Sequence, residues 1–462
     1  MSNPRVVLIS SPVKPSSANS QLDRSSQIID AIRQSLDAIW VGWSATGSDA
    51  APRGSGNNES LQVRVLSRAQ TTALSAQLNS QIMWPAFYGR ADLINFDSAA
   101  YDLYQNVNSQ LAADLATWLV DGDVVWVHDY LHVPIGHALR RAGVAVPVGF
   151  LCHAPFPAPD QITNLPRHEE VLRQLCAYDL AGFQSVDCRR HFEVAAQRVI
   201  GAQRTPNGLV GPFGNVMTRV QELPGRSRDI VKRAQSDIVR ASADHLREST
   251  AGQSLIASFA SLDQTQAIIE RLRSFEMLLT EAPEWRRRAS LVQATLPQRG
   301  WLPEDTQLRI DVERAFTSIN GEFATFGWTP IHYFHEPLDT VRLIALCRDS
   351  AVGLFTPFSE GVSLTAKDFI AAQQSDNPGV LIMSNLISGA ARHDGALLVN
   401  PHDKAETAHA IRLALSMPRA ERYVRWRKLM DLLDKEDLVG WCHDVIAEVL
   451  DARASNSSRA LS

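Results

Sequence analysis

The segment VAVPVGFLCHAPFPAPD (residues 144–160) changes character at a single histidine. Its first half, residues 144–151, is short, apolar and rich in valine, which is typical of a buried parallel strand. The three prolines after His153 exclude both a strand ladder and a helix. His153 is therefore predicted at the carboxyl end of a strand, where open α/β sheets bind their ligands. A lone histidine is more often a core residue bonded to backbone, so this segment alone leaves both interpretations open.

Strand and helix patterns alternate along the rest of the chain, which predicts parallel sheets covered by helices. The alternation is interrupted around residues 211–229 and restarts at residue 254. We expect an α/β fold of two Rossmann-like domains, whose parallel sheets face a central cleft. The domains are expected to span 1–225 and 226–440, with a C-terminal helix and tail, 441–462, packing back on the first domain. A Gly-, Ser- and Ala-rich stretch, 44–59, is predicted to be a solvated loop.

Composition excludes several classes of protein. The chain has 462 residues, a formal net charge of −5 and 45% hydrophobic residues, so a nucleic-acid footprint is not expected. No apolar run approaches the roughly 20 residues that span a bilayer, and we expect no membrane partner. Five cysteines without a CxxC pair predict reduced thiols and a cytoplasmic location. No GxGxxG motif follows the first strand, which disfavours a dinucleotide oxidoreductase. A homo-oligomer remains open.

Three further stretches carry candidate chemistry. His128 and Asp129 end a predicted strand and lie at the same edge as His153. Trp84 lies in a predicted loop bounded by proline, where it is either a core residue or a platform on which a sugar stacks. The stretch TPFSEGVSLTAKDF predicts a strand, a glycine turn and a helix, whose first N–H groups are suited to binding phosphate. No His, Cys, Asp or Glu cluster has metal-ligand spacing, so neither a metal nor another cofactor is expected.

Taken together, six motifs resemble the α,α-trehalose-phosphate synthases, a family of retaining GT-B glycosyltransferases. The motifs are VWVHDYLHVP, GFLCHAPFPAPD, LCAYDLAGFQS, INGEFATFGWTPIHYF, EGVSLTAKDF and GALLVNPHD. They occur in consistent order between residues 5 and 450. The resemblance implies a GT-B fold and transfer of glucose from a nucleotide diphosphate to glucose 6-phosphate. The implied partners are a nucleotide-activated sugar donor and a sugar or sugar-phosphate acceptor.

The resemblance also implies roles for residues that would bind the acceptor, most of them in the first predicted domain. Asp129 and Trp84 would line the acceptor pocket, and Arg299 would contact the acceptor phosphate. His153 would lie near the transferred sugar. Together with Asp129 and Glu360, it forms the implied catalytic set. Such enzymes use no protein nucleophile, and electrostatic stabilisation of the leaving phosphate provides most of the catalysis.

For the donor, the resemblance implies binding by the second domain. Glu360 would contact hydroxyls of the transferred sugar, and Asp368 would contact the ribose. The implied diphosphate turn consists of Gly361, Val362, Ser363 and Leu364. The hinge segment LPGRSRD adds Arg226 as a further candidate donor ligand.

The chain departs from the family at phosphate-binding positions. The family pattern RLDYxKG becomes SLDQTQA (261–267), so Ser261 replaces an arginine and Gln266 a lysine. Each lost charge-assisted bond is worth about 1.5–3 kcal/mol. On the acceptor side, an SNR segment becomes SSP (10–12), and Ser75 replaces a tyrosine. Cations that would compensate, or would instead be solvated surface charges, are Lys14, Arg24, Arg226 and Arg228.

Three functions therefore remain open. The first is a retaining glycosyltransferase with an altered donor or acceptor, including a sugar-like cyclitol as in the family's pseudo-glycosyltransferases. The second is a standard α,α-trehalose-6-phosphate synthase with rearranged phosphate ligands. The third is a catalytically degenerate binding or regulatory homologue. Retention of Asp129, His153, Trp84 and Arg299 disfavours the third function, whereas Ser261 and Gln266 favour it.

Overall fold

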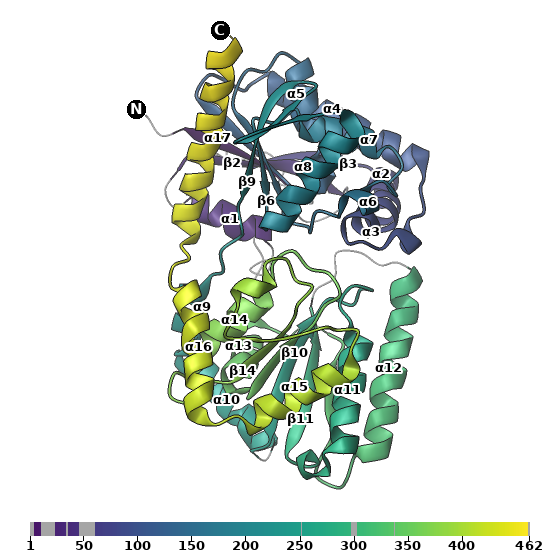
Figure 1. Cartoon of the computed structure of the whole chain (residues 1–462), viewed down its shortest axis with the longest axis vertical. Helices are drawn as coiled ribbons and strands as arrows, with labels where there is room; N and C mark the ends of the chain where they lie inside the picture. Colours follow the sequence, from purple (N-terminus) through teal and green to yellow (C-terminus); the bar gives the residue numbers. More distant parts are fainter. Residues whose placement is uncertain are drawn as a thin grey trace. The chain divides into compact units, whose positions relative to one another are not determined.

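The structure, a computed structural model, describes residues 4–10, 24–33, 36–45, 61–250, 252–296, 303–336 and 338–460. The chain divides into two compact α/β units (Figure 1). One comprises Met1–Leu223 with Leu438–Ser462, and the other comprises Pro224–Asp437. Each unit contains its own sheet, so the predicted α/β class with two parallel-sheet domains is confirmed.

Among its described residues, the first unit has a nine-stranded sheet in the order β3-β2-β1-β4-β5-β6-β9-β8-β7. All neighbours are parallel except the β7–β8–β9 meander at one edge. The order reverses between β1 and β4, which makes this position a topological switch point. The strands are β1 (Arg5–Ile9), β2 (Ala38–Ala45), β3 (Leu61–Leu66), β4 (Asp123–His128), β5 (Val148–Cys152), β6 (Leu180–Phe183), β7 (Gln203–Thr205), β8 (Gly208–Gly211) and β9 (Gly214–Val220).

Helices and shorter turns connect these strands. They are α1 (Arg24–Arg33), α2 (Arg68–Thr72), the π-helical segment η2 (Ala73–Met83), α3 (Trp84–Phe87), η3 (Ala91–Leu93), α4 (Ser98–Ala116), η4 (Tyr130–His132), α5 (Pro134–Arg141), α6 (Pro159–Ile162), α7 (His168–Leu175), α8 (Val186–Ile200) and α17 (Leu438–Ala460). The C-terminal helix α17 lies along β4, β5 and β9 of the same unit (Figure 1). Gly149 permits this approach, since a Cβ there would come within 2.5 Å of Val449 Cγ2.

One expectation for this unit was wrong. Ser44 and Ala45 belong to β2 rather than to the solvated loop predicted over 44–59, whose remainder lies outside the described residues. β2 lies between β1 and β3, and Ser44 pairs with Val65, so the strand continues despite polar and small residues. Around 211–229, where the sequence interrupts the alternation of strands and helices, β8 and β9 form part of an antiparallel meander with glycine at its turns.

The second unit has, in its described part, a six-stranded sheet in the order β12-β11-β10-β13-β14-β15, with every neighbouring pair parallel. Here the order reverses between β10 and β13, so the loops after these two strands diverge at a second switch point. The strands are β10 (Ser254–Ala260), β11 (Ala289–Thr295), β12 (Ile331–Phe334), β13 (Val352–Phe355), β14 (Val380–Ser384) and β15 (Leu397–Val399).

Helices α11, α12 and α15 group together in this unit, and α9, α10, α13, α14 and α16 form a second group (Figure 1). Their bounds are α9 (Ser227–Ala234), α10 (Asp237–Ser249), α11 (Ile268–Glu281), η5 (Pro283–Trp285), α12 (Pro303–Phe323), α13 (Thr340–Asp349), α14 (Leu364–Ala372), η6 (Ala390–Arg392), α15 (Lys404–Ser416) and α16 (Arg419–Leu433). In this doubly wound order, connecting loops line the carboxyl edge of the sheet, and the candidate donor residues lie in these loops.

Candidate functional site

His153 follows β5 and is 3% exposed. Its Nε2 lies 2.8 Å from Nδ1 of His128, the last residue of the neighbouring strand β4. The two rings lie with their centroids 5.0 Å apart. The histidine at the end of the strand is thus buried as a core residue would be, and it forms one half of an imidazole pair.

The imidazole pair has a defined protonation chemistry. Burial lowers the pKa of His128 to about 3, so this ring is neutral near pH 7. A hydrogen bond between two imidazole nitrogens requires one protonated and one bare nitrogen. The tautomer of His128 is therefore coupled to that of His153, because only one of the two facing nitrogens carries the proton. The sequence places His128 at this edge but indicates no role for it. His128 ends β4 and His153 follows β5, so strand order alone brings both to one edge, whereas their contact also depends on register.

Asp129 directly follows β4 and has an unusual backbone conformation, with φ 65° and ψ 168°. A positive φ at a non-glycine residue costs on the order of 1–3 kcal/mol and is concentrated at functional sites. Its carboxylate Oδ1 accepts hydrogen bonds from the N–H groups of Tyr130 at 3.1 Å and Ala154 at 3.3 Å. Ala154 follows His153, so the structure brings these two predicted site residues together on connected loops.

Trp84 was predicted in a loop, and this expectation was wrong. It is the first residue of α3, which continues directly from η2. Pro85 causes no break, because proline is tolerated in the first turn of a helix. Trp84 is half-buried and stacks on Tyr88, with ring centroids 5.4 Å apart. The same helix carries Phe87, which contacts the ring of Tyr130 at 4.8 Å and so places α3 beside the Asp129 loop.

The turn between β13 and α14 contains the predicted diphosphate-binding residues. Ser363 precedes α14 and makes no side-chain cap hydrogen bond to it within the described part of the chain. An uncapped helix start offers backbone N–H groups and a positive dipole end to an anion. The carbonyl of Glu360 accepts a hydrogen bond from the N–H of Ser388 at 3.0 Å, which ties this turn to the loop after β14.

Two of the predicted donor residues form an ion pair with each other. Arg226 Nη2 lies 3.3 Å from Asp368 Oδ2. Burial raises the pKa of the Asp368 carboxyl, and the charge of Arg226 opposes this shift. Arg226 is therefore paired with a carboxylate, and this pairing reduces the positive charge that Arg226 can offer to a phosphate. Arg228 is exposed on α9, whereas Lys14, Arg299 and the side chain of Arg24 lie outside the described residues.

A second contact fixes the segment that carries Arg226. Glu436 Oε1 lies 2.5 Å from Lys367 Nζ, and its Oε2 accepts the N–H of Gly225 at 2.6 Å. Lys367 is 2% exposed and belongs to α14. Glu436 consequently holds the residue before Arg226 against the helix that carries Asp368.

The loop after β10, residues 261–267, meets the β13–α14 turn. The N–H of Phe358 donates to the carbonyl of Thr265 at 2.7 Å, which joins the two loops at the switch point. Within the loop, Asp263 Oδ1 accepts the N–H of Thr265 at 2.9 Å and its hydroxyl at 2.5 Å. Ser261 and Gln266, which stand where the family has cations, therefore lie on a loop connected to the predicted phosphate turn.

Ala267 ends this loop in the left-handed region, with φ 50° and ψ 39°, where the family pattern has glycine. We expect Ala267→Gly to raise the free energy of unfolding by about 0.5–1 kcal/mol, because left-handed strain of roughly 1–2 kcal/mol exceeds the entropy cost of glycine. Urea unfolding measures this change. Ala405→Gly, in the exposed first turn of α15, is the control and should instead destabilise the protein. Equal losses in both variants would contradict the strain argument.

Arg271 was not predicted as a site residue. It lies on α11 and is 1% exposed. Its Nη1 donates to the carbonyl of Gln266 at 2.6 Å, whereas its Nε and Nη2 have no hydrogen-bond partner among the described residues. Burial lowers the pKa of Arg271 to about 10, and the charges of Glu270, Glu360 and Asp263 oppose that shift. The sequence signal was a charge on the helix face whose other members are Ile268, Leu272, Phe275 and Leu279.

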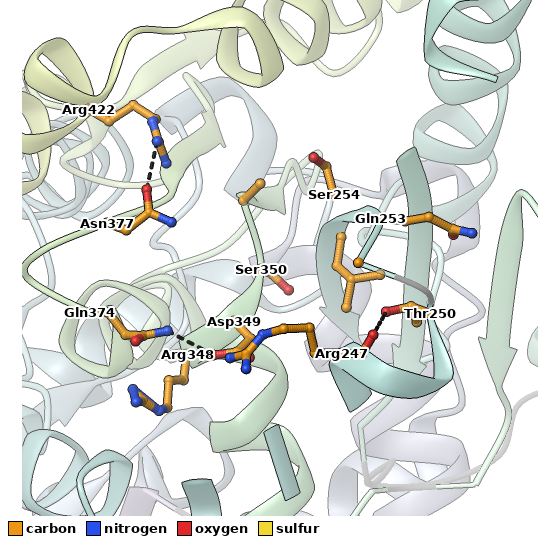
Figure 2. A pocket seen from close by; sticks show the side chains of 13 residues that line it. Arg247, Thr250, Gln253, Ser254, Arg348, Asp349, Ser350, Gln374, Asn377 and Arg422 are labelled. Carbon is orange, nitrogen blue, oxygen red and sulfur yellow. Dashed lines mark hydrogen bonds and ion pairs between the residues drawn. The ribbon is translucent and has the colours of Figure 1, made fainter. Parts of the chain in front are cut away.

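A separate pocket of about 210 Å³ lies at the other edge of this sheet (Figure 2). It is lined by Ser254 and Leu255 at the start of β10 and by residues just before β13. Two of its three lining arginines bond protein groups, since Arg247 pairs with Asp349 at 2.5 Å and Arg422 Nη2 donates to Asn377 at 2.8 Å. The buried Nε of the third, Arg348, has no hydrogen-bond partner among the described residues. Ligands of parallel sheets bind at the carboxyl edge, so this pocket is distinct from the candidate site.

The described ranges contain no group of three or more His, Cys, Asp or Glu side chains arranged to hold a metal ion. None of the helices in these ranges is long and apolar enough to cross a membrane.

Comparison with known proteins identifies the class to which this fold and site belong. The chain is similar to the α,α-trehalose-phosphate synthase (UDP-forming) of Burkholderia vietnamiensis, with a TM-score of 0.91, 34% identity and 98% of both chains covered. It also resembles trehalose-6-phosphate synthase from E. coli bound with UDP-2-fluoro glucose, with a TM-score of 0.89, 31% identity, and 96% of this chain and 98% of that one covered. These neighbours are GT-B enzymes, and the fold is of that type.

Sequence relatives lead to the same class. The trehalose-6-phosphate synthase of Klebsiella pneumoniae subsp. pneumoniae is 33% identical over 417 residues, which cover 90% of this chain and 88% of the relative. That of Pseudomonas savastanoi is 32% identical over 451 residues, which cover 96% and 95%. Glycosyltransferase family 20 matches residues 10–451. The chain belongs to glycosyltransferase family 20 and is a glycosyltransferase, as the sequence motifs predicted.

Proposed function

We propose that the protein is a retaining glycosyltransferase that moves a sugar, or a sugar-like cyclitol, from a nucleotide-activated donor to a sugar or sugar-phosphate acceptor. The observation that carries the proposal is the junction of the β10–α11 and β13–α14 loops through Thr265 and Phe358. This junction combines an uncapped helix start with a loop that lacks the two family cations at positions 261 and 266. The five cysteines, which are buried thiols, favour a reducing cytoplasmic location.

On the donor side, the N–H groups at the start of α14 would receive the diphosphate, and Glu360 would receive hydroxyls of the transferred sugar. Charge accumulates on the leaving phosphate as the glycosidic bond to the nucleotide breaks. Fixed N–H dipoles stabilise that charge without reorganising, which is the largest contribution available in a site of this kind. The departing phosphate oxygen then accepts the proton of the acceptor hydroxyl. Asp368, held by Arg226, would orient the nucleoside by bonding the ribose.

On the acceptor side, Asp129 and His153 would bond sugar hydroxyls, with Trp84 providing an apolar face. The backbone strain at Asp129 and the His128 contact hold these two polar groups in one orientation. Pre-organised groups of this kind bind a reacting sugar without a further entropy cost. This arrangement supports catalysis rather than a purely regulatory role.

The substrates are proposed to differ from those of the relatives. One relative was solved with UDP-2-fluoro glucose, and another, from Burkholderia xenovorans, with glucose-6-phosphate. In this chain Ser261 and Gln266 offer the diphosphate no positive charge, and a hydrogen bond to a charged group is worth about 1.5–3 kcal/mol. Standard trehalose-6-phosphate synthesis is the second candidate, and the high coverage of the relatives favours it.

The test is a matrix of UDP-, GDP- and ADP-glucose against glucose 6-phosphate, glucose and cyclitol phosphates. Nucleoside diphosphate release measures turnover, and NMR of the product identifies its anomeric configuration. We expect turnover with retention, a preference other than UDP-glucose with glucose 6-phosphate, and loss of turnover in Asp129→Asn. Efficient synthesis from that standard pair would instead establish the second candidate. Absence of turnover in every combination would favour the degenerate homologue.

A further inference from the structure

Arg271 has an unusual environment for a charged side chain. A guanidinium has five N–H donors and remains charged in proteins. Arg271 is 1% exposed, yet only its Nη1 has a partner, the carbonyl of Gln266 at 2.6 Å. Its Nε and Nη2 are among the buried atoms for which the described residues provide no acceptor. Buried charges are normally paired, whereas no carboxylate of the described residues is hydrogen-bonded to this guanidinium.

The surroundings of Arg271 indicate where its charge acts. The charges of Glu360 and Asp263, which lie on the β13–α14 and β10–α11 loops, act on Arg271. These two loops are joined by the hydrogen bond between Phe358 and Thr265. Arg271 therefore lies next to both loops of the proposed donor site, and it is buried beneath the point where they join.

Three other cations among the described residues of this unit are paired with carboxylates. Arg226 pairs with Asp368 at 3.3 Å, and Lys367 pairs with Glu436 at 2.5 Å. Arg273, on the same helix as Arg271, pairs with Glu276 at 2.9 Å. Arg271 differs from these three because its hydrogen bond goes to a neutral carbonyl. The charges of Glu360 and Asp263 act on it, but no hydrogen-bonded carboxylate neutralises it.

We propose that Arg271 provides the positive charge of the donor-diphosphate site, in place of the cations that Ser261 and Gln266 have replaced. The inference rests on the proposed function, and its ligand class is the nucleoside diphosphates. Arg271 is a positioning residue, because it stays beneath the loop. It holds the carbonyl of Gln266, which fixes the loop backbone. Its field, acting through protein rather than water, is screened little and favours a diphosphate over an uncharged nucleoside.

Calorimetric titration of UDP and of uridine separates this role from a structural one. We expect Arg271→Met to weaken UDP binding by about 10- to 100-fold while uridine affinity changes less than about 2-fold. Arg271→Lys should recover part of the UDP affinity, because it restores charge without the planar fork. Arg273→Met is the matched control and should bind both ligands as the wild type does. An unchanged ratio of UDP to uridine affinity in Arg271→Met would overturn the proposal.

If Arg271→Met does not fold, a second variant tests whether Arg271 provides the positive charge at the diphosphate site. The double substitution Ser261→Arg/Gln266→Lys restores the family cations while leaving Arg271 in place. If Arg271 already supplies the charge, UDP affinity should rise by less than about 3-fold. A rise of about 100-fold would show that the site lacks charge and would overturn the inference. Wild-type protein that binds none of UDP, GDP and ADP would instead refute the proposed function, whereas UDP binding indifferent to Arg271 would refute only this inference.

Discussion

Replacement of His153 by alanine is expected to lower turnover by about 10²-fold or more, as the loss of one hydrogen bond to the reacting sugar does. His153 is buried, lies beside Asp129 at the carboxyl edge of the sheet, and is oriented by His128 at 2.8 Å. Its removal leaves Nδ1 of His128 without its partner imidazole. We therefore also expect a loss of stability of about 1–3 kcal/mol, measured by urea unfolding.

His132 provides the matched control for this variant. It is also completely buried, its Nδ1 lies 2.8 Å from Asn108 Oδ1, and burial lowers its pKa to about 3, as it does for His128. His132→Ala should therefore cost similar stability while leaving turnover within about 3-fold of the wild type. Similar turnover in His153→Ala and His132→Ala would show that the role of His153 is structural and not catalytic.

The fold was predictable because the central strands of the first sheet are buried on two faces. β4 and β5 are buried at every residue and appear in the sequence as continuous apolar runs. The end of β2 was misassigned because the Gly-, Ser- and Ala-rich stretch begins at Ser44, although pairing with β3 holds Ser44 and Ala45 in a strand. Trp84 was misplaced because Pro85 suggested a break, whereas the preceding turns continue into α3.

The site was predictable only where topology alone places residues. His153 and Asp129 follow adjacent parallel strands, so their proximity required only the strand order. The contact between His128 and His153 depends on register, with His128 opposite Leu151, and no local pattern defines that register. Arg271 was missed because charges on helices are normally solvated. Only its place on the apolar face of α11 distinguishes it.

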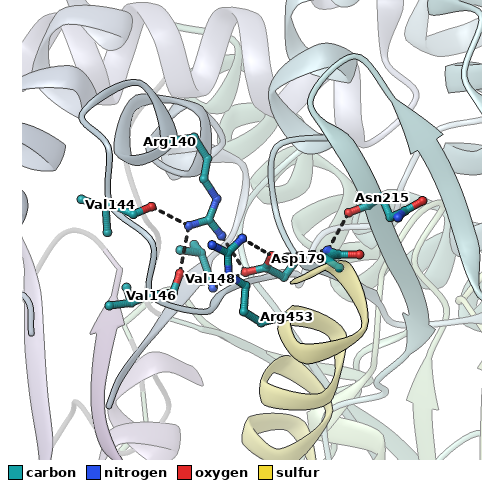
Figure 3. Close-up of polar contacts among 8 residues, drawn as sticks. Arg140, Val144, Val146, Val148, Asp179, Asn215 and Arg453 are labelled. Atoms are coloured by element: carbon teal, nitrogen blue, oxygen red, sulfur yellow. Dashed lines mark hydrogen bonds and ion pairs between the residues drawn. The ribbon is translucent and has the colours of Figure 1, made fainter. Parts of the chain in front are cut away.

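Asp179→Ala is expected to have the largest effect on stability. Asp179 precedes β6, and its carboxylate is 4% exposed. Its Oδ2 accepts Arg140 Nη2 at 2.6 Å and the N–H of Val148 at 2.8 Å, while its Oδ1 faces Arg453 and Asn456 of α17 (Figure 3). Removing the carboxylate leaves a largely buried guanidinium uncompensated, so we expect a loss of about 3–5 kcal/mol in urea unfolding.

The contribution of each partner can be separated by a second substitution. Arg453 is 31% exposed and lies 3.5 Å from Asp179, so Arg453→Met should cost less than about 1 kcal/mol. Arg140 is 18% exposed and also donates to the carbonyls of Val144 and Val146, which keeps it in place after the carboxylate is lost. If Asp179→Ala cost no more stability than Arg453→Met, the buried charge of Arg140 would not be the cause of the loss.

Asp179→Ala should also affect α17 and the site. Because α17 covers β4 and β5, whose ends carry His128 and His153, this variant should increase amide hydrogen exchange along α17 and lower turnover.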